Sequence, residues 1–437
     1  MNNIIVSSKF QKFKVIGKAG IKSGYIKGKS TVKKAFLSKE KENDETSNSN
    51  QEIAKVIVEA LGELKGVSVK IAQLLALNLN FLPKEYIDEL EKSFNKVPPL
   101  NKALIIKVIK KELKDYPNMI FDTFDLDVFA SASLGQVHLA KLHREKVVVK
   151  VQYPNMKQSI LNDIDILKYF LQKVAKSKEI NHLLDEIKDR LLEEIDYERE
   201  AYYYEYFRKN LKIDNIIIPK VYKNFTTKRV LTSQKIDGVI LKEFLKSNPS
   251  QSTRDRYAQM LFNSFFYSLY NLGVIHADPN PGNYLFCKDE KLAIIDFGCV
   301  KKIDNEFLNF YSKLHLALIK REDEDEIINM YEEIGMIDKT NIKDMRKFYI
   351  NTLKPLDSLY IEPFEVDIFD FATHKDFSKR GFEAILQIQK KQINSLDKLN
   401  QEFIFLDRTL LGLYAIFEKL QAKVDTSYAK KLMQKNR

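Results

Sequence analysis

The first apolar pattern in the chain has the period of a long helix. From about residue 52 onwards, apolar or small residues recur every three or four positions, which places them on one helix face. Phe81-Leu82-Pro83 ends this pattern, and Val97-Pro98-Pro99 marks a second break after another short helix. The stripe of the first predicted helix consists of Ile57, Leu61, Leu64, Ser68, Ile71 and Leu75.

Between Phe121 and Gln152 the pattern changes to that of short strands. Phe129 to Leu142 is predicted to form two strands around the small-residue turn Ala130-Ser-Ala-Ser-Leu-Gly135. A turn at His143 to Lys146 then leads into the β-branched strand Val147 to Gln152. This order predicts an antiparallel meander.

Beyond the meander the pattern is mainly helical. Long helices are predicted at about 155 to 176 and 182 to 210, followed by a strand pair near 216 to 236 that ends before Asp237-Gly238. The remainder is predicted to be helical, interrupted by one loop and strand from 275 to 298. No internal repeat is visible.

The composition is that of a globular protein with more than one core. The chain has 437 residues, of which 44% are hydrophobic and 30% charged, and the scarcity of Gly (14) and Pro (11) excludes collagen-like and low-complexity classes. The polar stretch from Lys41 to Gln51 is predicted to be a linker. No apolar run approaches the ~18 residues of a spanning helix, and no secretory signal is visible. Two cysteines, Cys287 and Cys299, fit a reducing compartment.

The excess positive charge lies at the start of the chain. Residues 1 to 39 hold ten lysines and no acid, whereas the remaining residues sum to a net charge of +1 out of +11. The body of the protein therefore gives no electrostatic case for nucleic-acid binding, and no nucleic-acid partner is expected. The lysine-rich segment could lie on an anionic lipid surface, be a solvated tail, or be a mitochondrial presequence, which its lack of arginine disfavours.

The most specific chemical signal is a pair of motifs in the C-terminal half. His276-Ala-Asp278-Pro-Asn-Pro-Gly-Asn283 is followed, after a short apolar strand, by Ile294-Ile-Asp296-Phe-Gly298. Each motif alone could be ordinary turn chemistry. Together they are similar to the catalytic loop and metal-binding triplet of protein kinases, in which carboxylate and amide oxygens bind the divalent cations that neutralise ATP phosphates.

Two upstream features agree with these motifs. Lys150 lies inside an apolar strand, where an ammonium is costly to bury without a partner, although it could also be an edge lysine in solvent. The small-residue turn Ala130 to Gly135, about twenty residues earlier, favours the phosphate interpretation, because small side chains let backbone N–H groups approach phosphate oxygens. Kinases commonly have a glycine-rich loop there, so the match is to a variant.

These motifs resemble those of the UbiB/AarF/ADCK family of atypical kinase-like proteins, from about residue 52 to the C-terminus. Lys70-Ile-Ala-Gln73 resembles the family's Lys-x-Gly-Gln motif, with Ala72 in place of glycine. Ala130-Ser-Ala-Ser133 resembles its alanine-rich phosphate loop, with Ser131 in place of alanine. Glu194-Ile-Asp196, followed by Glu200, resembles its Glu-x-Asp motif and downstream helix glutamate.

The resemblance implies roles for individual residues. Asp278 would be the catalytic acid or base, and Lys150 would bind nucleotide phosphates and pair with Glu200. Asn283 and Asp296 would hold Mg²⁺, and the nucleotide would be ATP or ADP. The residues expected to bind nucleotide are Ala130, Ser131, Ala132, Ser133, Lys150, Glu200, Gln234, Lys235 and Ile236. The residues expected to be regulatory, blocking the place of a peptide substrate, are Lys70, Gln73, Glu194 and Asp196.

The predicted fold class is α+β, a bilobal protein-kinase-like fold with a small antiparallel sheet in its N-lobe and a helical C-lobe. The expected parts are a basic N-terminal segment and linker (1–51), a helical extension (52–118), an N-lobe with inserted helices (119–236) and a C-lobe with the catalytic and metal loops (237–437).

The resemblance implies an ATPase or atypical kinase that supports ubiquinone or other isoprenoid-lipid metabolism at a membrane surface. No long activation segment follows Gly298, which argues against a peptide-docking platform. A nucleotide-binding pseudokinase scaffold and a true protein kinase stay open as alternatives. The expected partners are nucleotide, anionic membrane lipid and isoprenoid-quinone synthesis enzymes. The expected location is the cytoplasm, with peripheral contact to the inner face of a membrane, or a mitochondrion or other organelle in a eukaryote.

Overall fold

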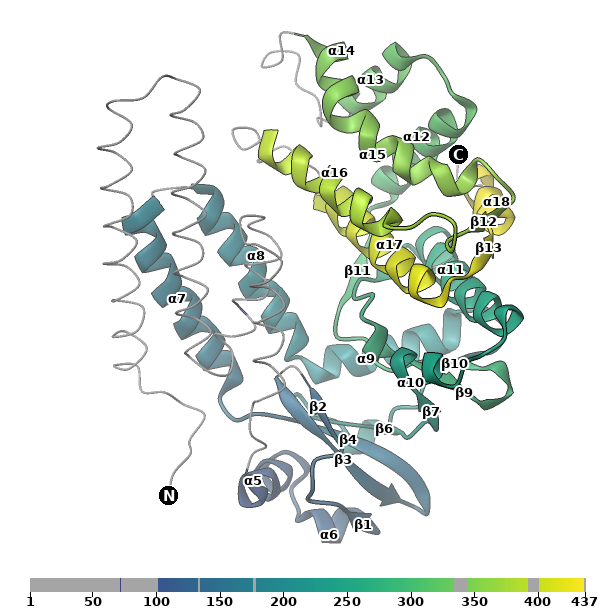
Figure 1. Ribbon diagram of the computed structural model, residues 1–437. Coiled ribbons are helices and arrows are strands. Elements are labelled where there is room, and N and C mark those ends of the chain that lie inside the picture. The colour runs from purple at the N-terminus through teal and green to yellow at the C-terminus, as the bar shows by residue number, and fades with distance from the viewer. Residues whose placement is uncertain are drawn as a thin grey trace. The chain divides into compact units, whose positions relative to one another are not determined.

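The computed structural model in Figure 1 describes most of the chain from residue 101 onwards. The predicted helix that begins near residue 52 lies outside the described residues except for Ile71, which is helical and buried. Lys70, Gln73 and Ser133 also lie outside them. The described residues are 71, 101–132, 134–175, 178–333, 344–391 and 401–435.

The described residues form two compact units, and the chain passes between them three times. One unit comprises the residues up to Arg199 together with Tyr222–Ser233, and the other comprises Glu200–Val221 and the residues from Gln234 onwards. The predicted α+β class is confirmed, because an antiparallel sheet precedes a mostly helical remainder. In the described part of the chain, no helix is both long and apolar enough to cross a bilayer.

The first unit contains a five-stranded sheet of order β1-β3-β4-β6, with β2 also paired to β3. The predicted meander is confirmed, since β3 and β4 pair antiparallel from Gly135 opposite Gln152 to Leu142 opposite Glu145. Their two-residue turn, His143-Arg144, has positive φ at both positions, as the right-handed twist of a hairpin favours. The strands are β1 (Thr123–Phe124), β2 (Ala130–Ala132), β3 (Gly135–Leu142), β4 (Glu145–Gln152) and β6 (Val230–Gln234).

Helix α5 (Lys102–Leu113) packs on this sheet. Asn101 caps it by accepting a hydrogen bond from the Ala103 N–H at 2.8 Å. Ile105 and Ile109 are fully buried against the branched side chains of β4, and α6 (Pro117–Ile120) follows directly. The core shared by helix and sheet includes Phe121, Ala140, Leu142, Val147, Val149, Val151 and Val230.

The predicted helix at 182 to 210 is wrong in one respect, because it is two helices. Helix α8 (Lys178–Glu194) ends before Ile195, and α9 (Tyr197–Asn210) begins after Asp196. The Asp196 carboxylate accepts a hydrogen bond from the Arg199 N–H at 3.1 Å, a typical N-terminal cap. The earlier helix α7 (Met156–Ala175) agrees with its prediction.

The predicted strand pair near 216 to 236 is also wrong. Strand β5 pairs in parallel with β10, more than seventy residues later, whereas β6 joins the sheet of the first unit. Parallel strands need a long connection, so the partner of β5 could not be a near neighbour. The second unit has a four-stranded sheet of order β5-β10-β9-β7, made of β5 (Ile216–Ile217), β7 (Gly238–Val239), β9 (Tyr284–Cys287) and β10 (Leu292–Ile294).

The second unit is otherwise mostly helical, but it contains more strands than predicted. Besides the four-stranded sheet, β8 (Val274–His276) pairs with β11 (Val300–Lys302), and β12 (Ile368–Asp370) pairs with β13 (Lys423–Asp425). The described helices are α10 (Leu241–Lys246), α11 (Gln251–Leu272), α12 (Asn305–Lys320), α13 (Glu324–Glu333), α14 (Met345–Phe348), α15 (Lys354–Ile361), α16 (Phe377–Lys391), α17 (Gln401–Leu420) and α18 (Ser427–Lys435).

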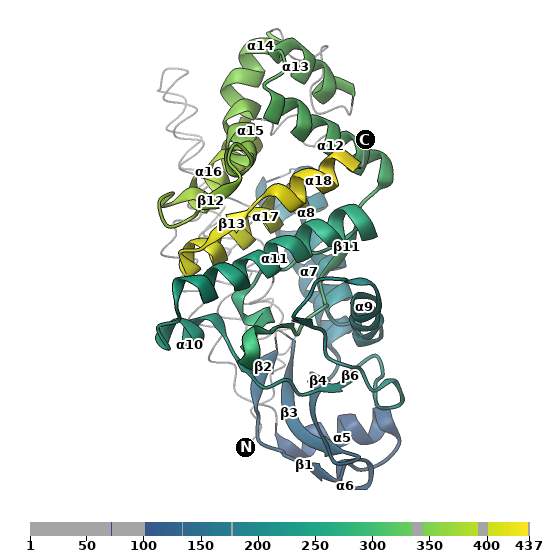
Figure 2. The ribbon, with the colours of Figure 1, turned by 90° about the vertical axis from the view of Figure 1, so that its right-hand side faces the viewer.

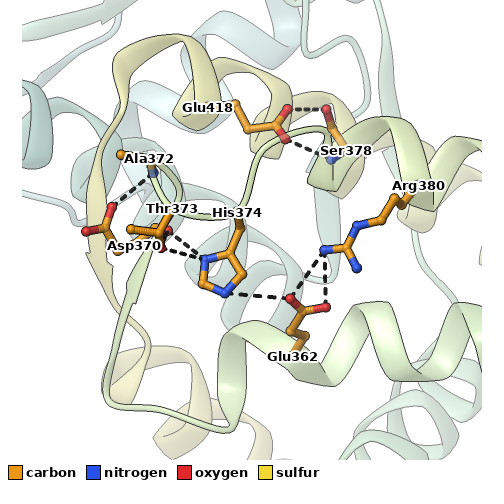
Figure 3. Close-up of polar contacts among 8 residues, drawn as sticks. All are labelled: Glu362, Asp370, Ala372, Thr373, His374, Ser378, Arg380 and Glu418. Carbon is orange, nitrogen blue, oxygen red and sulfur yellow. Dashed lines mark hydrogen bonds and ion pairs between the residues drawn. The ribbon is translucent and has the colours of Figure 1, made fainter.

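Polar contacts hold the loop between β12 and α16 (Figure 3). The His374 ring places Nδ1 2.8 Å from the Asp370 carbonyl oxygen and Nε2 3.7 Å from the Glu362 carboxylate. Arg380 donates to the same carboxylate at 3.3 Å, and Phe369 stacks on the His374 ring at 4.2 Å. These contacts join segments that precede and follow the loop.

Candidate nucleotide and metal site

Two antiparallel strand pairs of the second unit bring the two predicted motifs together. Strand β8 ends at His276 and pairs with β11, and the Ala277 N–H donates to the Cys299 carbonyl at 2.9 Å. Strands β9 and β10 also pair, and the Ile295 N–H donates to the Asn283 carbonyl at 2.9 Å. The loop that contains Asp278 and the loop that contains Asp296 are therefore neighbours, although they are almost twenty residues apart in sequence.

Asn283 and Asp278 are in direct contact. The Asn283 amide nitrogen donates to the Asp278 carboxylate at 2.9 Å and to its carbonyl oxygen at 3.1 Å. Asn280 shapes the loop between them by accepting from the Gly282 N–H at 2.9 Å. Burial, and to a smaller extent the charge of Asp278, raises the pKa of the adjacent Tyr284. These bonds fix the direction of the Asp278 carboxylate and leave the amide oxygen of Asn283 as its available ligand atom.

Asp296 is held from both sides of its loop. Its carboxylate accepts from the Gly298 N–H at 2.9 Å, and its carbonyl lies 2.5 Å from His276 Nε2. A carbonyl can only accept, so Nε2 carries the proton, and in the neutral ring Nδ1 is then unprotonated. Among the described residues, the buried Nδ1 has no hydrogen-bond partner.

Helix α9 packs against the Asp296 loop. Phe297 is fully buried between Tyr204 and Phe207, with ring centroids 4.7 and 4.9 Å away, and Tyr204 donates a hydrogen bond to the Ile295 carbonyl. A methyl group built on Gly298 would lie 3.9 Å from the Glu200 carboxylate. Glu200, which is 1% exposed, therefore lies beside the metal loop.

Helix α17 supports the Asp278 loop from another direction. A Cβ built on Gly412 would lie 2.3 Å from Cγ of Pro279, which is too close for any side chain. The helix backbone therefore touches the residue that follows Asp278. Sequence reasoning did not identify this contact, because it joins positions more than 130 residues apart.

The first unit contains the other predicted half of the site, with Lys150 at its centre. Lys150 lies in β4 opposite Val137, and its ammonium is 5.0 Å from the centre of the Tyr197 ring. This strand has neighbours on both sides, so Lys150 is not on an edge strand. The interaction of a cation with an aromatic face lowers the cost of partial burial.

The predicted phosphate loop is the end of the β2–β3 hairpin. Ala130 and Ser131 are exposed and Ala132 is partly buried, and all three are in β2 rather than in a turn. Ala132 pairs with Gly135, where a Cβ would lie 2.5 Å from the Val151 carbonyl and 2.9 Å from the Tyr197 hydroxyl. The turn itself is thus shorter than predicted.

A buried glutamine fixes the Glu-x-Asp segment. The Gln152 amide donates to the Ile195 carbonyl at 2.7 Å, and both residues are buried. Glu194 ends α8 and Asp196 caps α9, so the two acids flank this bond. Gln152 was not predicted as a site residue, although a glutamine within an apolar strand was a visible signal.

The three residues predicted at the end of β6 lie where the chain enters the second unit. The Gln234 N–H donates to the Lys220 carbonyl at 2.8 Å, and Lys235 pairs with Asp237. Gln234 is exposed, whereas Lys235 and Ile236 are partly buried. The backbone of Gln234 is thus fixed by a contact within the second unit.

The donor set of the second unit fits a magnesium nucleotide. Asn283 and Asp296 provide amide and carboxylate oxygens, the ligands that Mg²⁺ prefers, and phosphates and water commonly complete its coordination. Within the described residues, no group of three or more His, Cys, Asp or Glu could hold a metal ion by itself. Lys150 and Glu200 belong to different units, so their pairing stays a prediction.

The fold and the motifs define a class, the atypical kinase-like proteins. A solved structure, the complex of Rv3197 with erythromycin from Mycobacterium tuberculosis, matches with a TM-score of 0.61 over 89% of this chain and 97% of that chain, at 23% identity. This likeness establishes the kinase-like fold. The model of the ABC1 atypical kinase-like domain matches residues 92–331, more than half of the sequence, and the chain belongs to this family.

Two of the relatives are a plant protein and a fungal protein. The protein ACTIVITY OF BC1 COMPLEX KINASE 8, chloroplastic, of Arabidopsis thaliana is 28% identical over 78% of this chain and 46% of its own length. The atypical kinase COQ8, mitochondrial, of Schizosaccharomyces pombe is 28% identical over 86% of this chain and 61% of its own length. The chain spans about half the length of the first two relatives that it matches.

Proposed function

We propose that this protein is an ATP-dependent enzyme, an atypical kinase or ATPase, that binds ATP or ADP with Mg²⁺. The observation that carries the proposal is the contact of Asn283 with Asp278 beside the neighbouring loop of Asp296. Family membership implies nucleotide binding. Asn283 and Asp296 would hold the cation, which neutralises phosphate charge when bound, and Asp278 would orient or deprotonate the attacking hydroxyl or water.

The first unit would supply the phosphate contacts. Lys150 would meet the nucleotide phosphates and pair with Glu200, and the β2–β3 hairpin, Ala130 to Ser133, would cover them. Gln234, Lys235 and Ile236 would contact the nucleotide from the connection between the units. The burial of Glu200 and the cation–aromatic contact of Lys150 support this assignment.

We further propose that the enzyme supports ubiquinone or other isoprenoid-lipid metabolism at a membrane surface. The support is the sequence resemblance, together with the fungal relative named as an atypical kinase COQ8. Lys70 and Gln73, with Glu194 and Asp196, would occupy the place of a peptide substrate. The acceptor of the phosphate would then be water or a small lipid-related molecule rather than a protein. Contact with the membrane would be peripheral, and isoprenoid-quinone synthesis enzymes would be partners.

Two substitutions separate binding from turnover. Asp296→Asn should abolish Mg²⁺-dependent ATP binding, because an amide cannot supply the anionic ligand. Asp278→Asn should leave binding intact and lower phosphate release by at least about a hundredfold, the contribution typical of general acid–base catalysis. The measurement is phosphate release from Mg-ATP with parallel nucleotide-binding titrations.

The exposed Asp289, on the loop between β9 and β10, provides a matched control. Asp289→Asn makes the same chemical change outside the site and should behave like the parent. Parent-like turnover in both site variants would contradict the assignment. Binding without phosphate release in the parent would favour a pseudokinase, and phosphate transfer to added peptides would favour a protein kinase.

A further inference from the structure

Helix α5 carries a continuous basic face. Lys107, Lys110 and Lys111 follow the spacing i, i+3 and i+4, which places them on one side of the helix, and Lys114 is the residue that caps its C-terminal end. All four lysines are exposed, and the three within the helix lie opposite the buried side that faces the sheet. Among the described residues, none of the four lysines has a carboxylate within 4 Å.

The one acid of α5 does not neutralise this face. Glu112 lies on the inner side of the helix, where its carboxylate is 3.3 Å from the Arg229 guanidinium and accepts from the Thr227 hydroxyl at 2.9 Å. The charge of Glu112 is therefore compensated by Arg229 of the same unit. The outer face keeps its full positive charge.

Exposed apolar side chains lie beside these lysines. Leu104 is 40% exposed on the same side of α5 as Lys107 and Lys111. Met119, in α6, is 70% exposed, and Tyr116 is 46% exposed. The Tyr116 ring lies beneath Lys110, whose ammonium is 3.9 Å from the ring centre. Figure 2 shows α5 and α6 as neighbours at one end of the sheet.

We propose that this α5–α6 face, defined by Leu104, Lys107, Lys110, Lys111, Lys114, Tyr116 and Met119, is a contact surface for an anionic lipid membrane. Lysines on a helix attract anionic headgroups, while adjacent apolar and tyrosine side chains enter the boundary between headgroups and acyl chains. Nucleic acid would use the lysines but would leave Met119 and Leu104 exposed to water, so the combination favours lipid. The inference rests on the membrane part of the proposed function and gives it a location outside residues 1 to 39.

The test uses the full chain and vesicles of phosphatidylcholine with or without phosphatidylglycerol. Lys107→Glu combined with Lys111→Glu reverses two charges that the fold does not use, because neither side chain has a hydrogen bond or ion pair among the described residues. The variant should lose at least about tenfold of its affinity for the anionic vesicles. Its binding to neutral vesicles should stay weak and unchanged.

A matched control makes the same change of net charge elsewhere. Lys242 and Lys288, both exposed in the second unit, are replaced by glutamate, and this variant should retain the parent's vesicle affinity within about twofold. Met119→Ser should weaken the binding that persists in high salt, because apolar insertion is not screened. Equal losses in the two charge variants, or no loss in either, would overturn the proposal.

Two further outcomes separate this inference from the proposed function. If the parent binds no anionic vesicles, both the proposed contact surface and the membrane role are wrong. If the Lys107→Glu/Lys111→Glu variant loses binding to duplex DNA or RNA but binds vesicles like the parent, only the proposed contact surface is wrong. Mg-ATP binding measured without vesicles should be the same in the Lys107→Glu/Lys111→Glu variant and the parent. The enzymatic proposal is thus tested independently.

Discussion

Single side chains decide how the second unit responds to pH. Asp357, in α15, is 3% exposed and accepts a hydrogen bond from Tyr331 of α13. Burial raises the pKa of its carboxyl to about 7, although hydrogen bonds from Tyr331 and Tyr349 oppose the shift. Burial also raises the pKa of Asp407 in α17, and the charge of Asp357 adds to that rise. Both acids are therefore costly to ionise in the folded protein.

The Asp357→Asn variant measures this cost. The folded-state pKa is above the ordinary value of 3.8, so the folded chain holds a proton that the unfolded chain releases between about pH 4 and 7. The contribution of the protonated Asp357 carboxyl to the unfolding free energy is complete below about pH 4 and is lost as the pH rises through about 7. Asparagine cannot ionise, so the variant should exceed the parent's unfolding free energy at pH 8 by up to about 4 kcal/mol, at 1.4 kcal/mol per pKa unit.

Denaturant unfolding at pH 5 and pH 8 provides the comparison. At pH 5 Asp357→Asn should exceed the parent by less, at most about 2 kcal/mol, because only the unfolded parent has ionised there while the folded carboxyl is still protonated. Asp289→Asn, an exposed aspartate, should match the parent at both values. A difference between Asp357→Asn and the parent that does not change with pH would mean that Asp357 is ionised throughout.

At the residue scale, loop motifs were the clearest indication of the candidate site in the sequence. Asp278, Asn283 and Asp296 stand out because loop motifs keep fixed spacings, and the structure brings their loops together. The supporting residues were missed because they have no such spacing. Tyr204 and Phe207 look like any other aromatic residues of a helix, and only folding places them against Phe297.

At the scale of elements, the helical period predicted helices better than their ends. The apolar pattern runs from α8 into α9 without interruption, so the break at Ile195-Asp196 was not visible. The break has one tertiary and one local contact, since Gln152 of β4 binds the Ile195 carbonyl and Asp196 caps the start of α9. Strand β5 was predicted from its local pattern, whereas its parallel partner β10 depends on the fold of the whole unit.

The contact between α17 and the Asp278 loop gives a prediction at this scale. Alanine is the better helix former by about 1 kcal/mol, so helix propensity alone predicts that Gly412→Ala is stabilising. The new methyl group would instead overlap Pro279, at 2.3 Å from its Cγ. Overpacking of this kind costs about 1–3 kcal/mol, and the Asp278 loop should shift. We expect Gly412→Ala to lower both the unfolding free energy and phosphate release.

A second substitution identifies the cause. Pro279→Gly removes the ring that the new methyl group would meet. Gly412→Ala should therefore lower the unfolding free energy less in the Pro279→Gly background than in the parent. Additive losses in this double-mutant cycle, or a stabilised Gly412→Ala, would show that α17 does not press on the loop. Chemical denaturation of the four proteins gives the required free energies.

At the scale of the whole molecule, the residues of the proposed site belong to two units. Lys150 and the β2–β3 hairpin belong to the first, and Asp278, Asn283, Asp296 and Glu200 to the second. Helix α9 begins in the first unit and continues in the second, so it links the Asp196 cap to the Asp296 loop. The sequence motifs that predict the site therefore come from both units, and the site itself stays a prediction. The sequence could not predict that Glu200–Val221 belongs to the second unit and Tyr222–Ser233 to the first, because both assignments depend on non-local strand pairing.

The central proposal is that Lys150 and Asp296 both contribute to the binding of one magnesium nucleotide. Thermal unfolding of the parent, Lys150→Ala and Asp296→Asn, each with and without Mg-ATP, tests it most directly, because a ligand that binds only the folded state raises the unfolding midpoint. The account predicts that Mg-ATP stabilises the parent and that either substitution removes this stabilisation. Stabilisation of both variants to the same extent as the parent would contradict it.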